Sequence, residues 1–196
     1  MLPLPDRSFS GLIFDCDGTL VDSMPIHYVC WVEALRLNGA TFEFTEEEFY
    51  SYAGVREQDT VTILNMKHGT CVDPDAVAET KAEMFLKRIP EIQVVKPVAD
   101  YAREMFGRAP MAVASGSEAP IVHACLRSTG LFSLFPHIIT PVDVPRGKPA
   151  PDMFLLAAER MGVRPEDCLV FEDGNSGLKA AEAAGMEAVF IPRTMR

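Results

Sequence analysis

Short apolar segments alternate with helical segments along much of this chain, and this alternation constrains the fold more than any other feature. Each apolar segment ends abruptly at a polar or glycine-containing turn, which is typical of a buried strand that feeds a loop. Strands are predicted at residues 11–14, 111–114, 137–140, 168–171 and 188–191, and helices between them at 118–128, 152–161 and 176–184. The pattern predicts an α/β fold, with a Rossmann-like parallel sheet and helices on both of its faces.

The stretch between residues 25 and 97 interrupts this alternation, because it contains helix signals but no convincing strand. Pro25 is a plausible first residue of a helix, the segment Thr45-Glu-Glu-Glu48 fits a capping box, and Asp73-Pro74 is a further helix start. The stretch is therefore predicted to be all-helical.

Two units follow from this interruption. We expect an α/β core formed by residues 1–22 and 97–196, and an inserted helical cap domain formed by residues 23–96. The insertion comes directly after the first strand. It is therefore placed to cover the carboxyl ends of the strands, where such cores bind ligands.

Charge and composition exclude several classes of partner. The chain carries 28 acidic against 18 basic residues, a formal net charge of −10, which argues against nucleic acid or an anionic membrane as the main partner. An anionic substrate would have to be attracted locally, by a metal ion or by a few cations. The five cysteines are scattered and suggest neither a zinc site nor a disulfide framework. With no signal peptide and no long apolar run visible, a cytoplasmic location is expected; oligomeric state cannot be read from the sequence.

Four short polar motifs follow predicted strands or precede predicted helices. They are Asp15-Cys-Asp17-Gly-Thr19, Ser115-Gly116-Ser117, Gly147-Lys148-Pro149 and Glu172-Asp173-Gly174. Such loops converge at one edge of a doubly wound sheet, so side chains that are far apart in sequence can share a site. Together they supply carboxylates, a hydroxyl group and one lysine, which phosphoryl transfer needs. Each motif alone reads more simply as a turn, a helix cap or a surface lysine, so the inference depends on all four in this order.

In this order the motifs resemble those of the haloacid dehalogenase superfamily of phosphatases, and the position of the helical insertion matches the cap of that family. The resemblance covers nearly the whole chain. Segments 147–152 and 172–177 are most similar to the group that contains β-phosphoglucomutase and small sugar-phosphate phosphatases related to fructose-1-phosphate phosphatase. The resemblance implies a Mg²⁺-dependent phosphatase that hydrolyses a small phosphomonoester, such as a sugar phosphate, through an aspartyl-phosphate intermediate.

The resemblance also implies roles for the acidic residues. Asp15 would be the nucleophile, since a carboxylate that attacks phosphorus forms an acyl phosphate and splits hydrolysis into two easier steps. Asp17 would protonate the leaving alkoxide and then deprotonate the attacking water. Mg²⁺, a hard cation that prefers oxygen ligands, would be held by Asp15, by the main-chain carbonyl of Asp17 and by Asp173, with Glu172 acting through water.

The remaining motif residues would bind the phosphate group. Lys148 would neutralise the transferring phosphoryl group as a point charge, and Ser115 and the Gly116 amide would hold its oxygens. Gly18 would let the backbone turn sharply after Asp17, and Thr19 would hydrogen-bond the same loop.

Two cap residues are candidates for substrate specificity. Arg56, in the segment 54–57, resembles an arginine of the family's specificity loop that contacts the part of the substrate distant from the phosphate. His27, on the first predicted cap helix, matches a histidine of the mutase and sugar-phosphatase groups. Lys87 matches a cap lysine of the mutase but reads better as an exposed helix lysine, and Trp31 reads as a core residue.

Three rival functions share part of this pattern. A phosphosugar mutase would form the same aspartyl phosphate, but Thr19, Glu118 and Ala119 depart from the mutase pattern, and an acidic Glu118 would repel a second phosphate. A metal-free dehalogenase is disfavoured by Asp17 and Asp173 together, because family members of that kind need no metal and lack a counterpart of Asp17. A receiver-type signalling domain, which would hold its aspartyl phosphate as a message, has no use for Asp17 or for the cap.

Overall fold

Five parallel strands form one sheet in the computed structural model, which describes residues 2–53 and 55–195. The strands are β1 (Gly11–Phe14), β2 (Met111–Ala114), β3 (His137–Ile139), β4 (Cys168–Glu172) and β5 (Glu187–Phe190). Their order is β3-β2-β1-β4-β5, so β1 is central and pairs with both β2 and β4. The prediction of a Rossmann-like parallel sheet is confirmed, and the strand ends agree with the predicted ones to within one residue.

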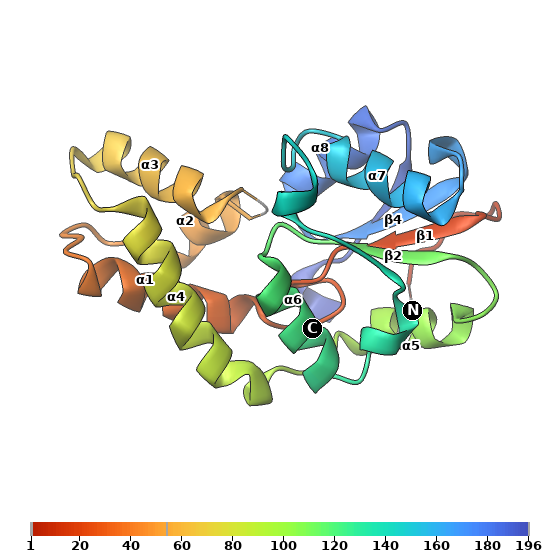
Figure 1. The fold of residues 1–196 in the computed structure, drawn as a ribbon, viewed down its shortest axis with the longest axis horizontal. Helices are drawn as coiled ribbons and strands as arrows, with labels where there is room; N and C mark the ends of the chain where they lie inside the picture. The colour runs from red at the N-terminus through yellow and green to blue at the C-terminus, as the bar shows by residue number, and fades with distance from the viewer. Residues whose placement is uncertain (1, 54, 196) are drawn as a thin grey trace.

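Helices cover both faces of this sheet (Figure 1). One layer consists of α5 (Lys96–Met105) and α6 (Ala119–Ser128), and the opposite layer of α7 (Asp152–Met161) and α8 (Asn175–Ala183). Leu12 and Phe14 of β1 are buried in the cluster that contains α5 and α6, whereas Ile13 is buried with α7 and α8. Successive side chains of a strand point to opposite faces, which is why the central strand is apolar throughout.

One core helix was not predicted from the sequence. α5 precedes β2, and it buries only the small or medium side chains of Val98, Ala99 and Ala102. Short 3₁₀ turns complete the connections: η1 (Ile89–Glu91), η2 (Phe132–Leu134), η3 (Pro141–Asp143), η4 (Pro165–Asp167) and η5 (Arg193–Met195). No helix in the described part of the chain has both the length and the apolar character needed to cross a membrane.

A group of four helices lies to one side of the sheet (Figure 1). They are α1 (Met24–Leu37), α2 (Glu46–Ser51), α3 (Glu57–His68) and α4 (Pro74–Arg88). These helices enclose an apolar cluster of their own that includes Trp31, Phe44, Leu64 and Val77. The predicted helical insertion is therefore observed.

Sequence signals explain where two of these helices begin. The Thr45 hydroxyl accepts a hydrogen bond from the Glu48 amide at 3.2 Å, as in a capping box, but the Glu48 side chain binds Lys67 at 2.7 Å and so does not complete the box. At α4, the Asp73 side chain accepts hydrogen bonds from the amides of Asp75 and Ala76. α4 begins where the sequence predicts, since an N-cap aspartate followed by proline specifies a helix start.

Two chain crossings join the helical group to the sheet. The Asp22 amide donates to the Gln93 carbonyl at 2.8 Å, and the Val95 amide donates to the Leu20 carbonyl at 2.9 Å. These bonds form a short antiparallel ladder where the chain leaves the α/β unit and where it returns. That residues 23–96 constitute a separate cap domain stays a prediction.

Candidate active site

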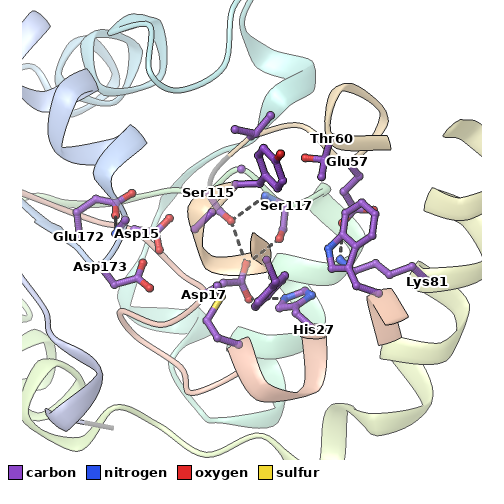
Figure 2. Close-up of a pocket in the computed structure, with 18 of the residues that line it drawn as sticks. Asp15, Asp17, His27, Glu57, Thr60, Lys81, Ser115, Ser117, Glu172 and Asp173 are labelled. Atoms are coloured by element: carbon purple, nitrogen blue, oxygen red, sulfur yellow. Dashed lines mark hydrogen bonds and ion pairs between the residues drawn. The ribbon is translucent and has the colours of Figure 1, made fainter. Parts of the chain in front are cut away.

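A cavity lies between the carboxyl ends of β1, β2 and β4 and the helical group (Figure 2). Residues that directly follow or end these strands line one side of it. They are Asp15, Asp17, Ser115, Gly116, Ser117, Glu172 and Asp173. The helical group lines the other side. The sequence-predicted strand-end residues thus meet at one edge of the sheet, as parallel topology requires.

A buried lysine, which does not itself line the cavity, is held between two of the cavity's carboxylates. Lys148 Nζ donates hydrogen bonds to Asp15 Oδ1 at 2.8 Å and to Glu172 Oε1 at 2.7 Å. Burial alone would lower the pKa of Lys148, but the charges and hydrogen bonds of Asp15 and Glu172 outweigh burial and raise it. Lys148 is therefore a permanent cation in contact with the predicted nucleophile.

Asp15 lies in an environment with too little positive charge. Burial is the largest cause that raises the pKa of Asp15, Lys148 acts against it, and the carboxylates of Glu172, Asp173 and Asp17 raise the pKa further. Ligand oxygens of Asp15, Glu172 and Asp173 lie within 4.8 Å of one another. A set of carboxylate oxygens this close, with one ammonium to balance it, fits a hard divalent cation.

Asp17 is held by hydrogen bonds on both of its oxygens. Oδ1 accepts from the Ser23 hydroxyl at 2.6 Å and lies 3.1 Å from His27 Nε2. Oδ2 accepts from the Ser117 hydroxyl at 2.7 Å and, more weakly, from that of Ser115 at 3.4 Å. These contacts fix the carboxylate between the strand-end loops and α1, as Figure 2 shows.

The same contacts set the protonation of Asp17. Burial acts to raise the pKa of Asp17, but a charge on His27 and the hydrogen bonds from His27, Ser23 and Ser117 lower it well below its usual range. Burial and the nearby Lys81 ammonium lower the pKa of His27 itself. The hydrogen bonds from His27, Ser23 and Ser117 do not require a charge on His27, because a neutral imidazole can still donate one hydrogen bond, so they favour ionised Asp17 in either state of His27.

Local geometry explains why glycine occurs at two positions near the site. Gly18 has φ of +84°, in the left-handed region, so the predicted sharp turn after Asp17 is observed. Gly177, in the first turn of α8, lies against the Glu172 side chain, and a Cβ at this position would be 1.8 Å from Glu172 Oε1. Glycine at 177 therefore makes room for the carboxylate that binds Lys148.

One prediction about this loop is wrong. Thr19 was expected to hydrogen-bond the loop, but its side chain is fully buried and its hydroxyl has no hydrogen-bond partner within the described chain. The neighbouring Leu20 and Val21 belong to the apolar cluster that also contains residues of α5 and α6.

The structure places the predicted cap residues differently relative to the cavity: one lines it and two do not. His27 lines the cavity, contacts Asp17 and stacks on the ring of Phe85 with 3.9 Å between centroids. Arg56 is exposed, precedes α3 and does not line the cavity; its neighbour Gly54 lies outside the described residues. Lys87 is exposed on α4, as expected.

Glu118 was expected to repel a second phosphate. The structure places it as the exposed N-cap residue of α6, outside the cavity lining, so its charge does not bear on the choice between phosphatase and mutase. The preference for a phosphatase over a mutase stays a prediction.

Sequence reasoning missed several residues of the site. Ser23 binds Asp17, and Glu57, Thr60 and Lys81 line the side of the cavity formed by the helical group. Ser117 belongs to a predicted motif, but its hydrogen bond to Asp17 was not predicted. A signal for Lys81 was present in α4, because Lys81 is spaced with Val77, Ala78 and Phe85 on the buried face of the helix. A lysine within such an apolar stripe indicates a buried charge with a specific partner.

Comparisons with known proteins agree with this geometry. The sequence model of the haloacid dehalogenase-like hydrolases matches residues 9–185. Fructose-1-phosphate phosphatase YqaB of Escherichia coli is 38% identical over 183 residues, which cover 93% of this chain and 96% of that protein. Hexitol phosphatase A of Escherichia coli is 30% identical over 185 residues, 92% of this chain and 82% of that protein.

A solved structure shows the same fold. CbbY from Rhodobacter sphaeroides, in complex with phosphate, superimposes with a TM-score of 0.82 at 25% identity, over 94% of this chain and 86% of that one. With a family match across most of the chain, and with the four motifs gathered at one cavity, the chain belongs to the family of haloacid dehalogenase-like hydrolases.

Proposed function

We propose that this hydrolase is a Mg²⁺-dependent phosphatase that removes the phosphate group from small sugar phosphates by way of an aspartyl phosphate on Asp15. The proposal depends chiefly on one observation: the Asp15 carboxylate accepts a hydrogen bond from the buried Lys148 and lines the same cavity as Asp17. The likeness to phosphatases named for fructose 1-phosphate and hexitol phosphates supports the substrate class.

In the first step, an Asp15 oxygen attacks phosphorus, and the bond between phosphorus and the sugar oxygen breaks. The leaving oxygen takes a proton from Asp17, and the acyl phosphate remains on Asp15. Lys148 would balance the charge of the phosphoryl group, while Ser115 and Gly116, which line the cavity at the turn after β2, would bind its oxygens.

Asp17 must be protonated before it can act as an acid, and in the resting site it is ionised. A bound phosphate group beside it would raise the pKa of Asp17, because the ionised carboxylate and the phosphate repel each other. A substrate that enters as its monoanion brings the required proton. In the second step Asp17 takes the proton back from water as the water oxygen attacks phosphorus, which frees Asp15 and inorganic phosphate.

The cation would be held by Asp15, Asp173 and the main-chain carbonyl of Asp17, with Glu172 close by. The donor set fits, since the carboxylate oxygens of Asp15, Glu172 and Asp173 converge within 4.8 Å. When bound, Mg²⁺ would offset the repulsion between these carboxylates and an anionic substrate and would polarise the phosphoryl oxygens.

The cap would supply selectivity and exclude water. His27 joins the cap to Asp17, so we assign it the positioning of the acid–base when the cap covers the site. Arg56, exposed before α3, could act only on a substrate group at the mouth of the cavity.

Sustained phosphate release from p-nitrophenyl phosphate and a panel of sugar phosphates tests the proposed phosphatase function. A single turnover that leaves the phosphate on the protein would contradict it.

Removing divalent cations should stop turnover. In excess EDTA we expect phosphate release to fall at least about a hundredfold, because the carboxylates of Asp15, Asp17, Glu172 and Asp173 would then repel the phosphate, and Lys148 is hydrogen-bonded to two of them, Asp15 and Glu172. Added Mg²⁺ should restore the rate and also raise the unfolding temperature, because a ligand that binds only the folded state stabilises it. Full activity in EDTA, with no thermal shift on titration, would contradict the metal site.

The Gly177→Ala variant should lose activity although alanine is the better helix former. A Cβ at 177 would overlap the Glu172 carboxylate and push it away from Lys148, and we expect kcat to fall at least about tenfold. Lys179→Ala, an exposed change in the same helix, is the matched control and should keep wild-type activity. Wild-type kcat in Gly177→Ala would show that the placement of Glu172 does not matter.

A further inference from the structure

A buried ion pair lies at the end of the cavity opposite the carboxylates. The Lys81 side chain, on α4, is 2% exposed, and its ammonium binds the carboxylate of Glu57, the first residue of α3, whose side chain is 16% exposed. The Lys81 ammonium also lies 5.9 Å from the ring centroid of Trp31 and 5.6 Å from that of Phe85. Figure 2 shows this pair on the far side of Asp17 and His27 from Asp15 and Asp173.

A buried ion pair is a costly way to hold α3 against α4. Two buried charges lose their hydration, and replacing such a pair with apolar side chains of similar volume is often neutral or stabilising. Here the surroundings are already apolar, and Glu57, Thr60 and Lys81 all line the cavity. A costly polar group that faces a ligand cavity is better explained by what it does to a ligand.

The charges at this end of the cavity cancel. Among the lining residues that the structure describes, Lys81 is the only ammonium or guanidinium, and Glu57 already neutralises it. The Glu57 carboxylate and the Thr60 hydroxyl oxygen can accept hydrogen bonds from a ligand, although the Thr60 hydroxyl already donates to the Arg56 carbonyl. The Lys81 ammonium can donate to a ligand, and the ring of Trp31 lies beside it. Sugar hydroxyl groups can use both kinds of partner, whereas a second anionic group would meet the Glu57 carboxylate.

We infer that the Glu57–Lys81 pair selects substrates whose part distant from the phosphate is uncharged and rich in hydroxyl groups, and rejects those that carry a second anion there. This inference rests on the proposed phosphatase function and names its substrate class. The Glu57 carboxylate would repel a second anionic group on the substrate, and Glu57 and Lys81 together would hydrogen-bond its hydroxyl groups.

Two compounds with the same carbon chain test the inference. Glucitol 6-phosphate and 6-phosphogluconate differ at C1, which is a hydroxymethyl group in the first and a carboxylate in the second. The wild-type enzyme should favour glucitol 6-phosphate in kcat/KM by at least about tenfold. Glu57→Gln, which removes the negative charge and keeps the shape, should shift this ratio at least about tenfold toward 6-phosphogluconate. The ratio cancels any general loss of activity in the variant.

A second cap ion pair supplies the control. Glu48 binds Lys67 at 2.7 Å, and neither residue lines the cavity. Glu48→Gln should therefore leave the ratio as in the wild type. A wild-type preference for 6-phosphogluconate, or an unchanged ratio in Glu57→Gln, would overturn the inference, and so would an equal shift in Glu48→Gln.

A double variant covers the case in which Glu57→Gln does not fold because Lys81 is left without its partner. Glu57→Gln with Lys81→Met removes both charges, and its loss on glucitol 6-phosphate should exceed its loss on p-nitrophenyl phosphate by at least about tenfold. Equal losses would overturn the inference. A wild-type enzyme that releases phosphate from p-nitrophenyl phosphate but fails these tests refutes the inference alone; no release from any phosphomonoester refutes the proposed function and the inference together.

Discussion

The Asp15→Asn variant is expected to show no turnover, with a loss in kcat of at least about 10⁴-fold. The amide has nearly the shape of the carboxylate, and its oxygen can still accept the Lys148 hydrogen bond that spans 2.8 Å in the structure. It cannot, however, form an acyl phosphate. The variant therefore removes the nucleophile and leaves the surrounding geometry in place.

Stability separates this loss from misfolding. Since the folded site raises the pKa of Asp15, the ionised carboxylate costs stability at pH values above its unfolded pKa, and Asn removes that cost. The metal-free variant should therefore unfold at a temperature no lower than the wild type. Asp100→Asn, on the exposed face of α5, is the matched control and should keep full activity. Residual turnover in Asp15→Asn near the level of that control would remove Asp15 from the mechanism.

Labelling gives a second, independent measurement. Wild-type protein quenched during turnover of a ³²P-labelled substrate should carry acid-stable, hydroxylamine-sensitive phosphate, as expected of an acyl phosphate. Asp15→Asn should carry none. Label that persists in the variant would move the covalent intermediate to another residue.

The convergence of the catalytic motifs could be predicted because it follows from topology. The runs at residues 11–14, 111–114 and 168–171 are apolar throughout, which is typical of strands buried on both faces, and the polar residues directly after them must then lie at one edge of a parallel sheet. Lys148 could be assigned to the site only by resemblance. Its contact with Asp15 depends on the path of the loop before α7, which no local pattern specifies.

The cap contacts could not be predicted in the same way. Glu57 and Lys81 meet because α3 packs against α4, and helix packing depends on the shapes of both surfaces. Two adjacent residues can therefore differ in whether their side chains line the cavity. Arg56 precedes the helix and stays exposed, whereas Glu57 is its first residue and lines the cavity. Resemblance of the segment was enough to locate the loop but not to choose between neighbours.

The Asp17→Asn variant should separate the two chemical steps. Asparagine can still hydrogen-bond Ser23, Ser117 and His27, but it can neither donate a proton to a leaving alkoxide nor take one from water. Steady-state kcat should fall by about 10²- to 10⁴-fold, the usual contribution of a general acid–base. The step that becomes slow should differ between substrates, and the rate of the first turnover shows which step it is.

With p-nitrophenyl phosphate the leaving group is a stable anion that needs no proton, so the variant should release about one equivalent of p-nitrophenolate rapidly and then stall as the aspartyl phosphate. With a sugar phosphate the leaving alkoxide needs the proton, so the first turnover itself should be slow. Ser117→Ala is the control, because it removes one hydrogen bond to Asp17 and leaves the carboxylate in place; it should lower both steps modestly and show no burst. Equal slowing of the first turnover with both substrates would mean that Asp17 positions the substrate and does not transfer the proton.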